Sequence, residues 1–233
     1  MLFCVAMSIV LSLGVAEAGV VWSDGFESYA GGSNINGQGG WFAWDNDPAY
    51  GGTVTSAYAA SGLHSLRLNG NDITFHGFTG YTSGTWTFRA KQYIPSDFGD
   101  WSSWAVEDNP GHDYISGLDI DVISGGAYQW DVVNAVSLVY DQWVDIAFVF
   151  DLNPGSHQVM AFYNHELIGQ RDWWVDGQSQ NNIDHIVLYG DGNPDKAIYY
   201  DDFALDGEPI PEPAGASLGL IGLALLVMKK RRS

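Results

Sequence analysis

The clearest signal along the chain is a strict alternation of apolar and polar side chains over short stretches. Residues 85–91 place Trp86, Phe88 and Ala90 on one side of an extended strand and polar residues on the other. Residues 143–150 alternate in the same way. Such strands have one buried face and one polar face. Further strands are predicted at residues 20–26, 65–68, 72–75, 115–122, 158–163, 182–189 and 197–205.

Tight turns separate these strands. Asp-Gly pairs, which favour tight reversals of the chain, occur at residues 24–25, 176–177, 191–192 and 206–207. No stretch shows the period of an amphipathic helix, and no repeat of about 20 to 50 residues is present. We therefore expect residues 19–208 to form one all-β domain, built as a sandwich of two packed sheets.

The composition suits short aromatic strands and excludes several partners. The chain has 29 Gly, 10 Trp, 12 Tyr and 11 Phe but only nine Lys and Arg, four of them at the C-terminal end. Without the two ends the formal charge is −21, from five basic and 26 acidic residues, so the surface repels nucleic acids and anionic lipid. Cys4, the only cysteine, lies in the apolar leader, and no disulfide can form within the domain.

Both ends carry apolar segments typical of exported proteins. Residues 2–15 are apolar and precede Ala16 and Ala18, whose small side chains fit a signal peptidase site. We therefore predict a signal peptide, with a signal helix, over residues 1–18. Near the other end, residues 214–228 form an apolar run of 15 residues. As a helix this run would reach roughly 22 Å, against about 30 Å of bilayer hydrocarbon, which makes it a marginal transmembrane helix.

The C-terminal segment, residues 209–233, resembles the PEP-CTERM sorting domain of Gram-negative bacteria. The resemblance rests on a proline motif, a Gly/Ala/Leu run and a basic cluster, namely Pro211, Glu212 and Pro213, then Lys229, Lys230, Arg231 and Arg232. It implies processing by an exosortase-type enzyme, anchoring in the inner membrane, and a place on the cell surface or in the extracellular matrix. Proteins of this family are tied to exopolysaccharide and biofilm. An ordinary membrane anchor, the alternative, predicts nearly the same location.

The central domain resembles concanavalin A-like and laminin-G-like domains. Residues 142–169 (QWVDIAFVFDLNPGSHQVMAFYNHELIG) match their strand, turn, strand and hairpin pattern, while SDGFESY and YYDDFALDG match their first and last strands. The resemblance implies a jelly-roll sandwich in which the first and last strands lie side by side. Related sandwiches often hold a structural calcium near those two strands.

Acids near both ends of the domain suggest calcium as a structural cofactor. Carboxylates that lie together repel each other unless they share a cation, and calcium takes about six to eight oxygen ligands. Asp24 and Glu27 lie near the first strand and Asp202 lies in the last, with Asp201 expected on the opposite face. A solvated acidic edge is the alternative. The loop at residues 191–195 is a second candidate, although it lacks the glycine that such calcium loops need.

The sequence offers only part of a hydrolase site. Laminarinase-type hydrolases of the concanavalin A-like class use a strand motif E-x-D-x-x-E, and the nearest segment here has Asp119 and Asp121 on one face. No glutamate stands at the nucleophile or acid position, so we expect no enzyme and no catalytic residue. The alternative is a glycan-active hydrolase or lyase that uses Asp119 and Asp121. His165 and Glu166 begin a zinc-protease motif but lack its second histidine, and we expect them at a hairpin tip.

Tryptophans in polar surroundings are the candidates for sugar binding. An aromatic face stacks on the apolar side of a sugar ring, while neighbouring Asp and Asn side chains bind its hydroxyls. Trp86 and Trp143 are instead expected in the core. The predicted binding residues are Trp41, Trp44, Asp45, Trp101, Trp104, Trp173 and Trp174.

Together these observations favour an exported, non-catalytic β-sandwich that binds polysaccharide on the cell surface or in the matrix. The two alternatives are the glycan-active enzyme and a purely structural matrix protein. No nucleic-acid partner is expected, because the domain is strongly acidic.

Overall fold

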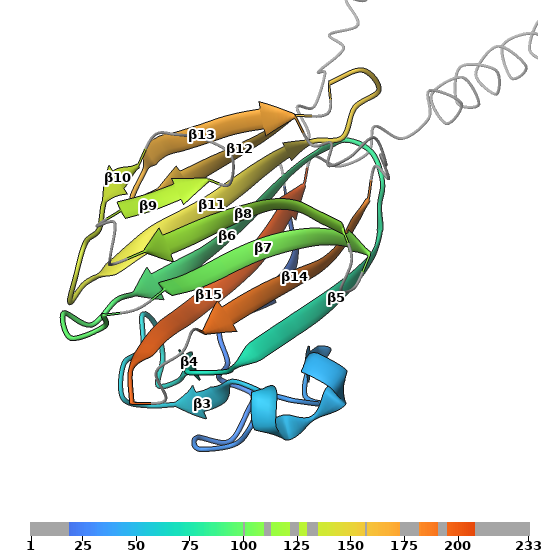
Figure 1. Cartoon of the computed structure of the whole chain (residues 1–233). Helices are drawn as coiled ribbons and strands as arrows, with labels where there is room; N and C mark the ends of the chain where they lie inside the picture. The colour runs from blue at the N-terminus through green and yellow to red at the C-terminus, as the bar shows by residue number, and fades with distance from the viewer. Residues whose placement is uncertain are drawn as a thin grey trace, which may run out of the picture. The chain divides into compact units, whose positions relative to one another are not determined.

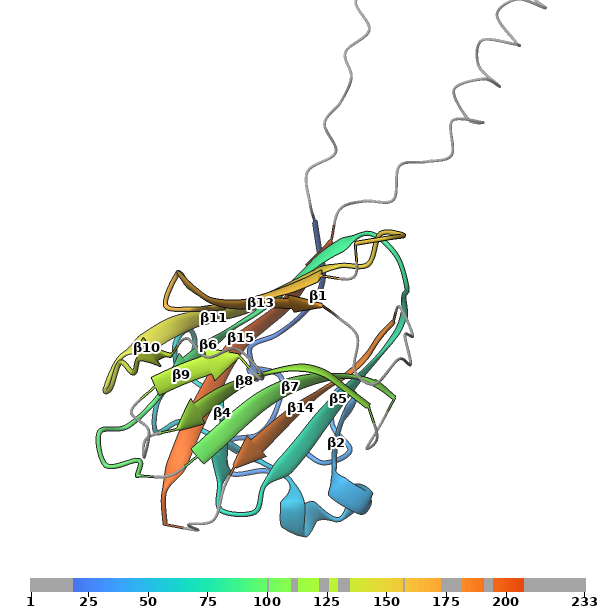
Figure 2. The ribbon, with the colours of Figure 1, turned by 45° about the horizontal axis from the view of Figure 1, so that its top comes forward.

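The computed structural model describes residues 19–99, 101–109, 113–121, 126–129, 135–156, 158–172, 182–190 and 195–207. Strands dominate this part of the chain, and its helical structure is limited to two short 3-10 turns, η1 (Trp44–Asn46) and η2 (Pro48–Tyr50). The strands form two sheets that lie face to face as layers (Figures 1 and 2). The predicted all-β, two-sheet sandwich is therefore confirmed.

The first sheet, called sheet A, has eight strands. Its order is β13 (Glu166–Asp172), β12 (Gln158–Tyr163), β11 (Trp143–Asp151), β6 (Thr85–Tyr93), β15 (Ala197–Gly207), β4 (Ser65–Asn69) and β3 (Thr53–Thr55). Neighbours along this path are antiparallel. The remaining strand, β1 (Gly19–Asp24), pairs with β15, which confirms that the first and last strands of the domain lie side by side.

The second sheet, called sheet B, has seven strands and lies in front in Figure 1. Its order is β10 (Val136–Ser137), β9 (Gly126–Gln129), β8 (Asp113–Asp121), β7 (Trp101–Asn109), β14 (Ile183–Gly190), β5 (Ile73–Tyr81) and β2 (Trp41–Ala43). All of these pairs are antiparallel.

Large aromatic side chains from both sheets fill the space between them. Trp104 of β7 packs edge-on against Phe148 of β11, with ring centroids 4.8 Å apart, and lies 5.5 Å from Phe88 of β6. All three are fully buried. Burying a side chain of this kind contributes about 1.5–3 kcal/mol, so this aromatic layer is a main source of stability.

The faces predicted from the alternation are confirmed in β6, where Trp86, Phe88 and Ala90 are buried and Arg89 lies outside. In β11 the inner positions begin at Val144. Trp143, which we expected in the core, therefore takes an outer position and is only partly buried.

The regular pairing of sheet A is interrupted in β15. The register against β6 shifts between Asp201 and Ala204, and Asp202 has a φ of 47° in the left-handed region. At this bulge Asp201 is fully buried, whereas Asp202 is partly exposed.

The predicted signal peptide at residues 1–18 and the sorting segment at residues 209–233 lie outside the described residues and stay predictions. A search of the described part of the chain for a helix long and apolar enough to cross a bilayer found none.

Candidate functional site

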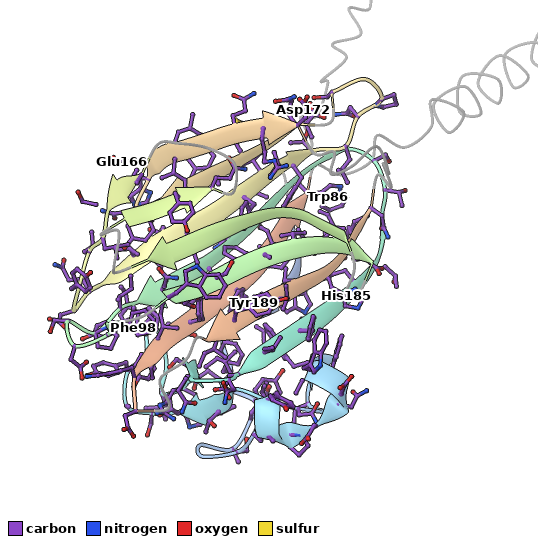
Figure 3. All side chains as sticks on the ribbon, viewed as in Figure 1. Trp86, Phe98, Glu166, Asp172, His185 and Tyr189 are labelled. Atoms are coloured by element: carbon purple, nitrogen blue, oxygen red, sulfur yellow. The ribbon has the colours of Figure 1, made fainter. Side chains whose placement is uncertain are left out.

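The outer face of sheet B, on the side away from the core, gathers aromatic and polar residues. In β7 the side chains of Trp104 and Val106 enter the core, so Trp101, Ser103 and Ala105 alternate with them on the outer face. On β14, Tyr189 shares this face and packs against Trp101, with ring centroids 6.2 Å apart. Figure 3 shows Tyr189 near one end of β14 and His185 near the other.

The strand register extends this group across the sheet. Tyr189 lies directly opposite Ser103, Ser103 opposite Asp119 of β8, and Asp119 opposite Tyr128 of β9. Directly paired residues share one face of a sheet. The next such pair joins Trp101 to Asp121. We refer to these six positions as the sheet B row: Trp101, Ser103, Asp119, Asp121, Tyr128 and Tyr189.

Ser103 is the unusual member of the row. Its side chain is fully buried, and its Oγ makes no hydrogen bond. An unpaired buried hydroxyl costs about 1–3 kcal/mol, so polar groups of this kind need an explanation when they persist. The neighbours of Ser103 across the sheet are Tyr189 and position 119.

A shallow depression of about 460 Å³ adjoins one end of the row. Trp101 and Tyr189 form one side of it, while Tyr50, Asn71 and Ile73 line the rest. Tyr50 is 37% exposed, so an aromatic surface is open to solvent there. The depression thus combines ring faces with an amide side chain, which are the two kinds of group that sugars contact.

A second aromatic group lies on the same face toward β2. The rings of Phe42 and Phe75 stack with centroids 5.2 Å apart, and Trp44 lies 6.1 Å from Phe75. Trp44 is 38% exposed. His185 meets Phe42 edge-on, and burial lowers its pKa despite Asp184 beside it, so its imidazole is neutral near pH 7.

The structure separates the predicted sugar-binding residues into two sets. Trp44 and Trp101 lie on the outer face of sheet B, and Asp45 is exposed in η1 between β2 and the next turn. The prediction was wrong for Trp41 and Trp104, because their relative exposures are 1% and 0% and both belong to the core. Trp173 and Trp174 lie outside the described residues.

Asp24, one of the predicted calcium ligands, is already occupied by protein donors. Its Oδ1 accepts the Phe26 backbone N–H at 2.9 Å. Its Oδ2 accepts the Tyr29 hydroxyl at 2.5 Å and the Trp41 indole N–H at 2.8 Å. In the structure, Asp24 therefore holds core aromatic side chains in place.

The other two predicted ligands bind a neighbouring loop. Glu27 Oε1 accepts the backbone N–H groups of Leu63 and His64, which lowers the pKa of Glu27. Asp202 Oδ1 accepts the Ser61 hydroxyl at 2.6 Å. A search of the described residues found no group of three or more Asp, Glu, His or Cys side chains that could hold a metal. Calcium stays a prediction.

Asp201, at the bulge in β15, binds the backbone of a neighbouring loop. Its Oδ2 accepts the backbone N–H groups of Ala60 and Ser61, at 2.8 and 3.3 Å, and its Oδ1 accepts the N–H of Asp202. Burial raises the pKa of Asp201 to about 6. The acids of the last strand thus fasten the loop before β4 to the middle of sheet A.

Sequence reasoning missed Ser103, Tyr189 and Tyr50. A serine next to a tryptophan carries no signal by itself, and cross-strand neighbours depend on register, which the sequence does not reveal. Asp119 and Asp121 both lie in β8, two positions apart, and their role stays a prediction.

No protein-family model matches the chain, and no curated protein matches its sequence. Among solved structures, a sialidase is similar with a TM-score of 0.50 and 12% identity, over 74% of this chain and 18% of its own. The carbohydrate esterase of bacteriophage phi24B is similar with a TM-score of 0.51 and 10% identity, over 83% and 100%. The cellulose-induced protein Cip1 has a TM-score of 0.49 and 15% identity, over 79% and 96%. This chain therefore spans less than a fifth of the sialidase.

At these identities the likeness shows the fold alone. It nevertheless corrects one expectation, namely that the chain is no enzyme. We reached that expectation from the absence of a laminarinase-type motif, yet structures described as a sialidase and a carbohydrate esterase share this fold. The absence of one motif is thus no ground for calling this β-sandwich non-catalytic.

Proposed function

We propose that this protein is a glycan-active enzyme, a hydrolase or lyase of the concanavalin A-like jelly-roll class, and that its active face is the outer face of sheet B. One observation carries the proposal. Strand register brings Asp119 and Asp121 onto the same face as Ser103, Trp101 and Tyr189. Two acidic positions beside aromatic rings are features of a glycan-cleaving site.

The spacing of the two acids suggests the reaction type. Strand positions two residues apart are separated by about 6.8 Å. Inverting glycosidases hold their two carboxyl groups about 6.5–9.5 Å apart, so that water fits between the sugar and the base. Positions 119 and 121 thus suit a mechanism in which one acid protonates the leaving oxygen and the other activates water. The rings of Trp101, Tyr50 and Tyr189 would hold the adjoining sugar units.

The likeness to a sialidase and a carbohydrate esterase supports a glycan-related role through the fold they share. The sequence supports export in addition. We propose that the signal peptide is removed before Gly19 and that residues 209–233 anchor the protein in the inner membrane until an exosortase-type enzyme processes it. The domain would then meet polysaccharide at the cell surface or in the matrix.

The function is tested by incubating the purified protein with a panel of neutral and acidic polysaccharides. Release of reducing ends, or of unsaturated products for a lyase, is expected from at least one of them. Asp119→Asn and Asp121→Asn should each lower the rate by at least about 100-fold, because general acid and base catalysis contributes that much. Glu166→Gln, which changes an exposed acid in β13 of sheet A, is the matched control and should keep the rate.

Two results would contradict the proposal. One is binding of a polysaccharide without release of any product across the panel. The other is product release that the Asn variants leave unchanged. Circular dichroism of each variant establishes that it is folded, so a loss of rate reports on chemistry.

A further inference from the structure

The outer face of sheet A, on the opposite side of the sandwich from the sheet B row, holds a second depression of about 380 Å³. Arg89, Lys91, Asp145 and Asp202 supply its charged groups, and Val20 and Ser23 of β1 line one edge. The five basic residues of the domain are few against its 26 acids, and two of them meet here. Their concentration at one depression calls for an explanation beyond solubility.

Each cation in this depression is matched by a carboxylate. Arg89 Nε lies 2.6 Å from Asp206 Oδ2, and Lys91 Nζ lies 2.7 Å from Asp145 Oδ1. The side chains of Arg89, Lys91 and Asp145 remain 49%, 36% and 43% exposed. At such exposure the ion pairs contribute little to stability, about 0–1 kcal/mol each. They do present hydrogen-bond donors and acceptors side by side to solvent.

A group of aromatic side chains adjoins the charged depression. Trp143 of β11 lies opposite Tyr93 of β6, and Tyr93 lies opposite Tyr199 of β15. Tyr58 stacks on Tyr93 with ring centroids 4.4 Å apart and an interplanar angle of 24°, and is itself 38% exposed. Trp143 and Tyr93 lie 5.5 Å apart. We call these four residues the Tyr58 platform.

The platform and the depression are consecutive along the same strands. Asp145 and Lys91 face each other one register step of two residues away from Trp143 and Tyr93. From Arg89 to Tyr93 the strand extends about 13 Å, which is longer than a single sugar ring. Stacking surfaces and alternating donors and acceptors therefore follow one another in a straight line.

We propose that this face is a second glycan-binding site, distinct from the sheet B row, and that it takes a neutral oligosaccharide. The Tyr58 platform would stack against a sugar ring, while Arg89, Lys91 and Asp145 bind hydroxyls of the units that follow. The glycan is neutral because each cation is already matched by a carboxylate and because the acidic surface repels polyanions. This inference rests on the proposed function, since it assigns a further contact to the same class of ligand.

A site on the face opposite the active face would hold the protein on its polymer while a different chain segment is cleaved. Loss of this site should therefore lower activity on insoluble polysaccharide and spare activity on short soluble substrates. This split separates the second site from the catalytic face.

The test is calorimetric titration of the full chain, carrying Asp119→Asn and Asp121→Asn to prevent cleavage, with cellohexaose, laminarihexaose, xylohexaose, mannohexaose and hexagalacturonate as probes. A neutral hexasaccharide should bind at two sites per chain. Tyr58→Ala with Lys91→Met should remove one of them, or weaken it at least about tenfold. Tyr50→Ala changes a matched tyrosine at the sheet B depression, and should leave the affinity of the second site on sheet A unchanged.

Several outcomes would overturn the inference. These are an unchanged second site in the Tyr58 and Lys91 variant, a preference for hexagalacturonate, or no binding by any neutral probe. If product release still depends on Asp119 and Asp121 in any of these cases, the proposed function stands and only the second site falls. If no product is ever released, the proposed function falls whatever the titrations show.

Discussion

Asp72 offers a test of the electrostatics that the fold imposes. It lies in the turn before β5 and is only 7% exposed. Its Oδ2 accepts the Asn69 backbone N–H at 2.9 Å, and Arg67 attracts it, but burial outweighs both and raises the pKa of Asp72 to about 6. The native protein therefore prefers the protonated acid at pH values where the unfolded chain already carries the charge.

The sign of the effect follows from proton binding. Between the usual pKa of 3.8 and the native value of about 6, the folded state binds more protons than the unfolded state, so stability falls as the pH rises through this window. The interval corresponds to about 3 kcal/mol at most. Asp72→Asn keeps an oxygen for the Asn69 N–H and has no charge to bury. We therefore compare the free energies of unfolding of the variant and the parent. The variant's advantage should be about 2–3 kcal/mol larger near pH 7.5 than near pH 4.

The assay is urea unfolding followed by tryptophan fluorescence at about pH 4, 5, 6 and 7.5, for the parent and the variant. Asp201, whose pKa burial also raises to about 6, contributes equally to both proteins and cancels in the difference. Asp97→Asn is the control, because the hydrogen bond from Lys196 lowers the pKa of Asp97 and its stabilising effect is already present above about pH 4. Its parent-to-variant difference should therefore stay nearly constant across this range. A parent-to-variant difference for Asp72 that stays constant within about 0.5 kcal/mol across this range would refute the reasoning.

Three further predictions concern packing and calcium. A Cβ at Gly207 would overlap the ring of Trp86, so Gly207→Ala should cost about 1–3 kcal/mol in urea unfolding, whereas Gly99→Ala meets no atom and should be nearly neutral. Trp41→Ala removes a buried ring whose indole N–H also donates to Asp24, and should lower the free energy of unfolding by about 3–5 kcal/mol. Trp44→Ala, at an exposed ring, should lower it by about 1 kcal/mol or less. Equal losses would contradict the burial assigned to Trp41. If the calcium prediction is correct, adding calcium after chelation raises the melting temperature, and identical melting curves would count against it.

Local alternation predicted much of the fold, because the two-residue period of a strand is written into neighbouring residues. The buried positions of β6 and β11 and the two-layer architecture followed from it. The same rule could have gone further for Trp101 and Trp104. They are three residues apart in one strand and must lie on opposite faces, so at most one of them could reach a surface ligand.

The remaining features depend on which strands become neighbours, and no local pattern specifies that. Ser103 and Tyr189 are 86 positions apart in the chain and meet only because β7 pairs with β14 in one register. Asp24 shows a related limit, since the sequence grouped it only with acids of the first and last strands, as a candidate calcium ligand. Its actual partners, Tyr29 and Trp41, are donors that the fold brings to it.

The placement of β15 has a consequence for how the protein is made. This last strand lies between β6 and β4 and also pairs with β1, so sheet A has no centre until residues 197–207 are present. A chain emerging from the ribosome cannot complete its interior before its final segment is released. Until residues 197–207 have been made, β6 and β4 lack the strand that joins them.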